Sequence, residues 1–299
     1  MADHLERIGQ TVGDYRLLNW LGGGGFGHVY LAEPEHREEG GTPAIVESIR
    51  AGLVFQLKLA VGEAEIRRKE ESFVRRAIAR WRRHPQLEIL GNPDLERLSI
   101  VSFVVKHSER YLHHNFVVAV LNDLFGIQSR GGCSCAGPYG HRLLGIDLER
   151  SHEFEREIGR GREGIKPGWV RVNFNYFISE TVFEFILAAV EMVAAEGWRL
   201  LPEYRFDPLT GLWTHRAGPP EPPLTLRAIS YTDPKQHGWA HRHLEPESAL
   251  ARYLEEASRV LGRPGERPET MELGADFEHL RWFWLPHELV QEPSPRGRA

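Results

Sequence analysis

The chain has 299 residues, a formal net charge of −5 and a hydrophobic fraction of 41%. This length suits one large or two small domains, and the acidic balance gives no electrostatic reason to expect nucleic acid or an anionic membrane as a partner. The chain has two cysteines, separated by one residue, so they exclude a disulfide framework and favour a reducing, cytoplasmic setting. We see no signal-peptide core at the N-terminus and no apolar run of about 18 residues, so we expect no membrane span.

The first regular feature is a glycine-rich hairpin at residues 14–33, where two β-like runs flank a glycine turn. The pattern GxGxxGxV over residues 22–29 resembles the loop that covers nucleotide phosphates in protein kinases. A kinase also needs a lysine on its third strand and two further motifs, and the closest triplets, at 241–243 and 276–278, each lack the deciding residue. We therefore treat residues 1–33 as a kinase-like hairpin that is not a complete domain.

The next segment has the periodicities of an α/β protein. Thr42 is a good N-cap and a proline follows it, so we expect a helix there, followed by a second helix over 63–83. The apolar runs 87–90 and 98–105 predict paired strands, of which the second is the more central. Residues 116–124 predict a helix that ends at a glycine.

Residues 168–178 form the clearest predicted strand. Polar side chains, with Arg171 among them, alternate with apolar ones, so one face of the strand belongs to a core and the other is unusually polar. The remaining predictions are a helix around 147–158, a helix over 181–195, a hairpin over 206–213, an amphipathic helix over 246–262 and a frayed end after Pro286.

Both cysteines lie in one loop of small residues, RGGCSCAGP at positions 130–138. Its glycines allow the backbone to approach another group closely. From the residues alone, the loop is either a tight turn with two buried cysteines or an accessible reactive loop. Zinc is less favoured because no second cysteine pair exists and His141 is the one imidazole nearby. We predict no metal site here, and we expect the histidines at 237, 241 and 243 to be solvated.

This loop, followed by a short helix, resembles the cysteine-bearing loop of class V aminotransferases and cysteine desulfurases, which are pyridoxal-phosphate (PLP) enzymes of fold type I. The resemblance runs with gaps from about residue 36 to about residue 226. It implies an α/β fold, the C-terminal part of a fold-type-I PLP-dependent transferase, with a small sheet and helices packed on one face. The expected divisions are residues 1–33 for the hairpin, 34–200 for the family's C-terminal domain, and 201–299 for a hairpin, linker and C-terminal helical extension.

The resemblance implies roles for four residues. Thr42, at a helix N-terminus that suits a phosphate, would contact the PLP phosphate of a neighbouring subunit, which implies a homodimer with shared sites. Arg171 would bind the α-carboxylate of an amino-acid substrate. Cys135, rather than Cys133, falls at the sulfur-accepting position of desulfurases, and Arg130 accompanies it. The implied chemistry is amino transfer, or elimination or sulfur transfer from an amino acid such as cysteine.

The lysines depart from the family pattern. The chain has 32 arginines but five lysines, and none of the five stands in the sequence context of the lysine that holds PLP in this family. That lysine would precede Thr42, where this chain has the kinase-like hairpin. We therefore expect an incomplete or chimeric chain that is inactive by itself. The alternative from another class is a catalytically inactive remnant or interaction module, and an ATP-binding kinase fragment is the distant alternative.

Overall fold

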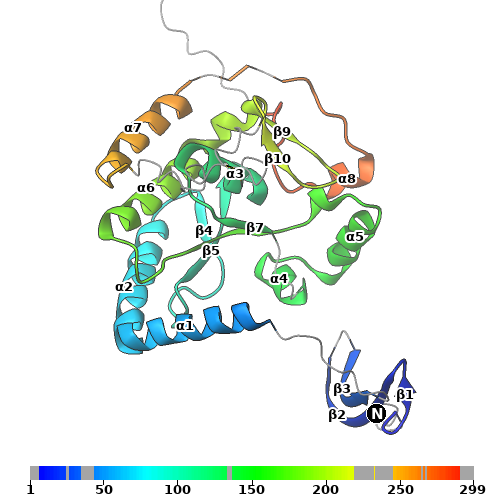
Figure 1. Cartoon of the computed structure of the whole chain (residues 1–299). Coiled ribbons are helices and arrows are strands. Elements are labelled where there is room, and N and C mark those ends of the chain that lie inside the picture. The colour runs from blue at the N-terminus through cyan, green and yellow to red at the C-terminus, as the bar shows by residue number, and fades with distance from the viewer. Residues whose placement is uncertain are drawn as a thin grey trace, which may run out of the picture. The chain divides into compact units, whose positions relative to one another are not determined.

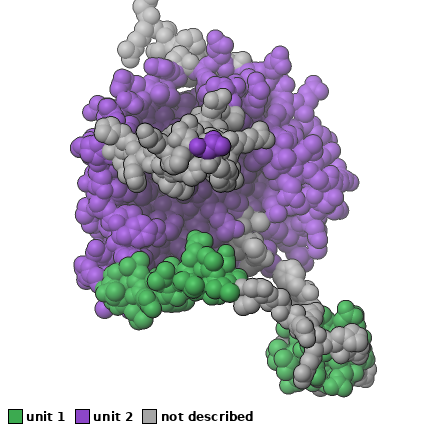
Figure 2. Space-filling model, in the orientation of Figure 1, with its two compact units in different colours: residues 1–62 green, residues 63–299 purple. Residues whose placement is uncertain are grey.

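The computed structural model describes residues 7–24, 27–34, 44–132, 137–218, 232, 245–263, 265–266 and 268–289, and the side chains of 22–24, 27 and 28 are not described. The chain divides into two compact units, residues 1–62 and residues 63–299, which Figure 2 colours green and purple. No described helix is both long enough and apolar enough to cross a membrane.

The first unit begins with a three-stranded antiparallel sheet formed by β1 (Thr11–Val12), β2 (Tyr15–Gly24) and β3 (Gly27–Pro34). The predicted strand–turn–strand hairpin is therefore confirmed, whereas the kinase resemblance stays a prediction. Helix α1 (Ile45–Val61) follows, with Ala44 at its N-cap position and no side-chain cap. The expected cap at Thr42 is wrong, because the helix begins three residues after it; Thr42 itself lies outside the described residues.

The second unit is built on an antiparallel sheet with the strand order β4-β5-β8-β7. A short strand, β6 (Arg110–Leu112), also pairs with β5. The predicted pairing of two apolar runs is confirmed, and the second of them, as β5, lies between β4 and β8. The four strands of the main order are β4 (Leu87–Ile89), β5 (Ile100–His107), β8 (Trp169–Asn173) and β7 (Arg130–Gly132).

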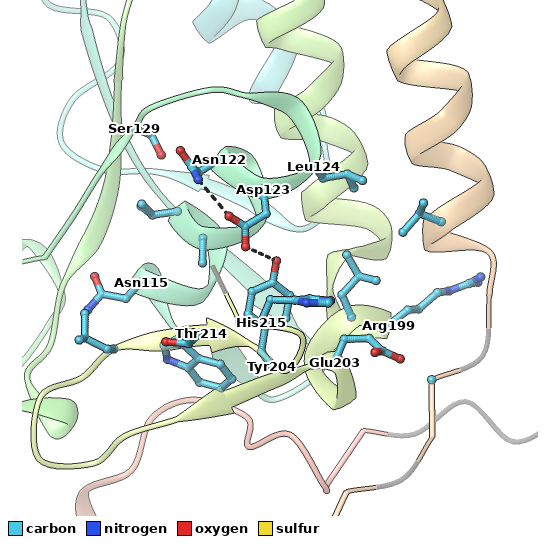
Figure 3. Close-up of a pocket in the computed structure, with 18 of the residues that line it drawn as sticks. Asn115, Asn122, Asp123, Leu124, Ser129, Arg199, Glu203, Tyr204, Thr214 and His215 are labelled. Atoms are coloured by element: carbon cyan, nitrogen blue, oxygen red, sulfur yellow. Dashed lines mark hydrogen bonds between the residues drawn. The ribbon is translucent and has the colours of Figure 1, made fainter. Parts of the chain in front are cut away.

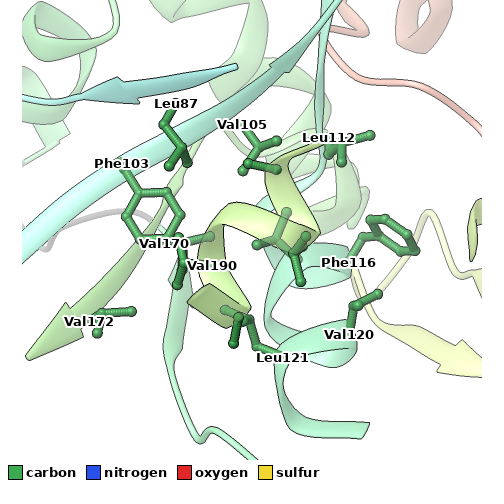
Figure 4. Close-up of a cluster of buried hydrophobic side chains, with 14 of the residues drawn as sticks. Leu87, Phe103, Val105, Leu112, Phe116, Val120, Leu121, Val170, Val172 and Val190 are labelled. Carbon is green, nitrogen blue, oxygen red and sulfur yellow. The ribbon is translucent and has the colours of Figure 1, made fainter. Parts of the chain in front are cut away.

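Three helices bury their apolar sides on one face of this sheet: α2 (Glu63–Trp81), α3 (His114–Phe125) and α6 (Glu180–Glu196). Figure 4 shows strand residues such as Phe103 and Val170 meeting Val120 and Val190 from the helices. Trp81 is fully buried and its indole N–H donates to the Leu187 carbonyl at 3.4 Å. Burying large apolar side chains on both sides of the interface supplies the main stabilisation of the unit.

The opposite face of the sheet is more sparsely covered. The seven-residue helix α4 (Gly137–Leu143) packs there against Trp169, and a Cβ at Gly140 would lie 3.3 Å from the indole ring. Trp169 forms a small apolar cluster with Leu90 and Val104. The arrangement confirms the expected class, a small sheet in an α/β protein with its long helices on one face (Figure 1).

Residues beyond 200 contribute to the same core. The hairpin of β9 (Tyr204–Phe206) and β10 (Trp213–His215) buries Phe206 and Trp213 in it. The segment 281–289 is also packed, since Leu285 is buried and Glu288 binds Arg281, so the expected frayed end after Pro286 is wrong as far as residue 289. The other elements are α5 (Leu148–Gly159), η1 (Glu163–Ile165), η2 (Gly197–Glu203), α7 (Ala249–Leu261) and α8 (Ala275–Leu280).

Candidate functional site

Strand β8 presents Arg171 on the face of the sheet opposite the long helices. Val170 and Val172 are buried against α3 and α6, and because side chains alternate along a strand, Arg171 points to the other side. The strand ends at Asn173, earlier than the predicted 178. The backbone N–H of the next residue, Phe174, still donates to the Ser99 carbonyl, but a turn at 176–177 then interrupts the extended backbone. The predicted polar face is therefore real but shorter than expected.

Strand β7 places Arg130 directly across from Arg171. The register of the antiparallel pair aligns Arg130 with Arg171 and Gly132 with Trp169. Glycine is required at 131, since a Cβ there would lie 2.7 Å from Asn115 Oδ1 on α3. Directly opposed residues of an antiparallel pair project to the same face, with Cβ atoms about 5 Å apart. The two guanidinium groups therefore share one surface of the sheet.

This arginine pair has no counter-charge of its own. Within the part of the chain that the structure describes, neither Arg130 nor Arg171 forms an ion pair or a side-chain hydrogen bond with another residue. Like charges directly opposite each other on a sheet are unfavourable. Arg171 is half-buried and Arg130 is exposed, so the pair combines partial desolvation with access from solvent. The arrangement suits an anion that bridges or is gripped by the two side chains.

The described strand residues beside Arg171 on this face, apart from Arg130, are uncharged. Ser102 on β5 lies opposite Arg171 on the side away from β7. Asn173, the next residue on the same face, donates through its amide to Asn175 Oδ1 at 3.2 Å. The surroundings of the pair therefore offer hydroxyl and amide groups, and sequence reasoning named neither Ser102 nor the pairing itself. Strand alternation around Ser102 could have signalled its face, but only the register gives its partner.

Two of the four residues to which the resemblance gives a role, Thr42 and Cys135, lie outside the described residues, as does Cys133. The described chain does fix the two ends of the cysteine loop: β7 stops at Gly132, which has a φ of 122°, and α4 starts at Gly137. The loop thus leaves the sheet two residues after Arg130, at the end of the strand that carries this arginine.

Two buried histidines at the start of α3, beside strand β7, were not identified from the sequence. His113 and His114 are 1% and 5% exposed, and their rings stack with centroids 4.2 Å apart. Nδ1 of His113 accepts a hydrogen bond from the backbone N–H of Asn115, and the His113 side chain thereby caps the N-terminus of α3. The ring proton is therefore on Nε2, which donates to the Gly164 carbonyl at 3.2 Å. Burial lowers the pKa of both rings, that of His114 to about 3. Their signal in the sequence was a polar pair at the start of an apolar helix.

The described lysines do not come together with the arginine pair. Lys69 lies beside Glu65 and Lys166 beside Glu163, each on an exposed surface. Lys106 shares a face of β5 with Ser102 but stands four residues, or about 13 Å, further along the strand. Lys58 belongs to the other unit, and Lys235 lies outside the described residues. The described residues of the second unit therefore fit the binding of an anionic substrate group but not a covalent attachment of PLP.

One family model matches part of this chain. Residues 13–151 match the model of the aminotransferase class-V family. The matched range takes in Arg130 and also the N-terminal hairpin that the sequence resemblance left out, and it ends before β8. Together with the observed α/β architecture, the match fits part of a fold-type-I PLP transferase.

Two individual proteins are similar to the chain. A probable cysteine desulfurase of Halobacterium salinarum is 28% identical over 122 residues, which make up 41% of this chain and 28% of that protein. The apo structure of the cysteine desulfurase from Thermococcus onnurineus NA1 is 25% identical, with a TM-score of 0.41 over 62% of this chain and 38% of that one. The chain thus covers well under half of the length of these relatives.

Among the described residues, no group of three or more histidine, cysteine, aspartate or glutamate side chains is arranged to hold a metal ion. The histidines at 237, 241 and 243 lie outside those residues. The described side chains of the candidate site are two guanidinium groups on one sheet face, one of them on the strand at whose end the cysteine-bearing loop begins.

Proposed function

We propose that residues 63–299 carry the substrate-carboxylate part of a class V aminotransferase-like site, which acts on an amino acid. The observation that supports this most is the pair of guanidinium groups, Arg130 and Arg171, opposed on one sheet face without a described carboxylate partner. A planar guanidinium can hold a carboxylate through two parallel hydrogen bonds, which fixes its orientation as well as its position.

In this proposal Arg171 is the residue that binds the substrate α-carboxylate. Arg171 is half-buried on a strand between two others, while Arg130 on the edge strand adds positive charge from the same face. A substrate anion would relieve the repulsion between the two side chains, so part of its binding energy comes from an unfavourable contact in the free protein. The hydroxyl of Ser102 is the nearest neutral donor across the strand.

The finer roles belong to the same proposal and rest on the family. Cys135 would accept sulfur from the substrate as in a cysteine desulfurase, and Thr42 would contact the phosphate of PLP bound to a second subunit of a cytoplasmic homodimer. The described residues do not supply the lysine that holds PLP in the family. We propose that this chain alone is catalytically inactive.

The test measures binding of a simple amino acid, L-alanine, to the full chain by ligand-observed NMR, with L-alaninamide as the matched ligand that lacks the carboxylate. We expect L-alanine to bind and Arg171→Gln to weaken it about tenfold or more, since a hydrogen-bonded charged partner is lost. The control is Arg205→Gln, which removes an exposed arginine from strand β9. Equal binding of the two ligands, or an unchanged affinity in Arg171→Gln, would favour a non-catalytic interaction module instead.

A further inference from the structure

A second candidate site lies on the opposite side of the sheet from the arginine pair. A cavity of about 980 Å³ opens between α3, η2, the β9–β10 hairpin and the end of α7 (Figure 3). Helix α3 covers the face of the sheet to which Val170 and Val172 point, so the cavity and Arg171 belong to different faces. The volume lies at the upper end of the range of pockets that hold small organic ligands.

One carboxylate in this cavity is held in place by neutral donors. The Tyr204 hydroxyl donates to Asp123 Oδ2 at 2.9 Å, and the Asn122 amide donates to Oδ1 at 2.9 Å (Figure 3). Burial raises the pKa of Tyr204, and the negative charge of Asp123 raises it further, so this phenol remains a donor and does not ionise at ordinary pH. No cation within the described chain pairs with Asp123.

A second carboxylate, that of Glu203, lines the same cavity and forms no ion pair or side-chain hydrogen bond with a described residue. Arg199 also lines the cavity but forms no ion pair with Asp123 or Glu203. Arg199 pairs with Glu196 at 3.6 Å and lies over the Trp198 ring, and Figure 3 shows its side chain extending away from Asp123. Arg263 also lines the cavity, is exposed where α7 has ended and forms no ion pair with a described residue. The unpaired groups of the described lining are therefore two carboxylates and one guanidinium, which leaves one negative charge in excess.

The rest of the lining is mainly apolar and aromatic. It includes Val118 and Ala119 from α3, Leu200 from η2, Trp213 from β10 and Val260 from α7. Two unpaired carboxylates beside apolar walls suit a molecule that has a positive group at one end and a hydrocarbon or aromatic body. A neutral apolar ligand would leave both carboxylates without a counter-charge, and an anionic one would be repelled.

We propose that this cavity binds an organic ammonium ion with an aromatic or aliphatic body. The ammonium group would approach Asp123 and Glu203, and the body would displace water from the walls formed by α3, η2 and β10. The Tyr204 hydroxyl acts as a positioning group, because its hydrogen bond fixes the orientation of the Asp123 carboxylate. This site is independent of the proposed carboxylate site, so failure of one leaves the other unaffected.

The test uses the full chain and three probes of equal size: phenethylamine, 2-phenylethanol and phenylacetate. Isothermal titration calorimetry should show binding of phenethylamine at least about tenfold tighter than that of the neutral and anionic probes, because the first alone offers a charge-assisted hydrogen bond to a carboxylate. Equal affinity for the three probes, or no phenethylamine binding at millimolar concentration, would overturn the proposal.

Variants locate the site within the chain. Asp123→Asn keeps an acceptor for Tyr204 but removes the charge, and it should weaken phenethylamine binding about tenfold. Tyr204→Phe removes the hydroxyl that orients Asp123 and leaves the charge, so it should weaken binding less than Asp123→Asn does, even if the melting temperature falls. Glu109→Gln neutralises an exposed acid outside the cavity and should change nothing. Full binding in Asp123→Asn, or an equal loss in Glu109→Gln, would contradict the assignment.

Discussion

The guanidinium of Arg281 forms two hydrogen bonds with the carboxylate of Glu288, at 2.8 and 2.7 Å, and the Arg281 side chain is only 4% exposed. Burial by itself would raise the pKa of Glu288, but the bonds from Arg281 and from the Leu285 backbone N–H outweigh it and lower that pKa. This pair joins the beginning of the segment after α8 to a residue seven positions further along it. A buried charge pair of this kind is costly to break on one side.

We therefore expect Glu288→Ala to lower the free energy of unfolding by about 3 kcal/mol, because it leaves the Arg281 charge buried with less compensation. Glu278, which also bonds Arg281 but is more exposed, should matter less when changed to alanine. Urea unfolding of both variants measures the difference. Replacing the pair together, as Arg281→Met with Glu288→Leu, should restore much of the loss; equal effects of Glu278→Ala and Glu288→Ala would contradict the role of the pair.

The buried histidines predict a loss of stability in acid. The pKa of His114 is lowered from about 6.5 to about 3 in the folded protein, so between these values the unfolded chain binds a proton that the folded chain does not. Stability therefore rises with pH across this window and falls by up to about 1.4 kcal/mol per pH unit for each such ring as the solution is acidified. His113, whose pKa is also lowered by burial, adds to this slope.

Urea unfolding at about pH 6 and about pH 4 checks the acid effect, because both values lie inside the His114 window of about 6.5 to 3. His114→Phe keeps an aromatic ring but cannot titrate. The slope of its unfolding free energy against pH should therefore correspond to about one bound proton fewer than in the parent chain. His152→Phe, at an exposed position beside Glu155, is the matched control and should keep the slope of the parent chain. An unchanged slope in His114→Phe would show that the ring is protonated in the folded state.

The lysines predict that the chain does not hold PLP covalently. None of the described lysines stands with the arginine pair, and three of them lie in helices or beside acidic neighbours on the surface. After incubation with PLP and reduction by borohydride, peptide mass mapping should find scattered, substoichiometric pyridoxyl groups. One lysine carrying the label at stoichiometric yield would refute this prediction and identify the missing residue.

The cysteine loop predicts a difference between its two thiols. If Cys135 occupies the sulfur-accepting position, the nearby positive charge of Arg130 should favour its thiolate, so limiting iodoacetamide at neutral pH should alkylate Cys135 before Cys133. Arg130→Ala should slow that reaction about threefold or more, whereas Arg205→Ala, on an exposed strand far along the chain, should not. Equal labelling of both cysteines would make the loop an ordinary turn.

Local pattern was enough to determine several parts of this protein. The alternation around Arg171 predicted which side chains of β8 enter the core, and apolar spacing predicted helices α2, α6 and α7 with small errors at their ends. These features follow from interactions between residues close in sequence, so the chain reveals them without its fold. The start of α1 was misjudged because Thr42 satisfies the local rule for a cap, while the helix begins beyond it.

Only the tertiary structure decided which groups meet. Strand β7 has three residues, two of them glycine, so it carries no alternation, and its pairing of Arg130 with Arg171 depends on the register of a segment 41 residues away. The cavity beside Asp123 likewise joins α3, η2, the β9–β10 hairpin and α7, which no local period relates. The buried ring of His113 depends in the same way on Gly164, 51 residues away, whose carbonyl accepts its hydrogen bond. Register and polar burial are set by long-range packing, because each depends on which surfaces the whole fold removes from water.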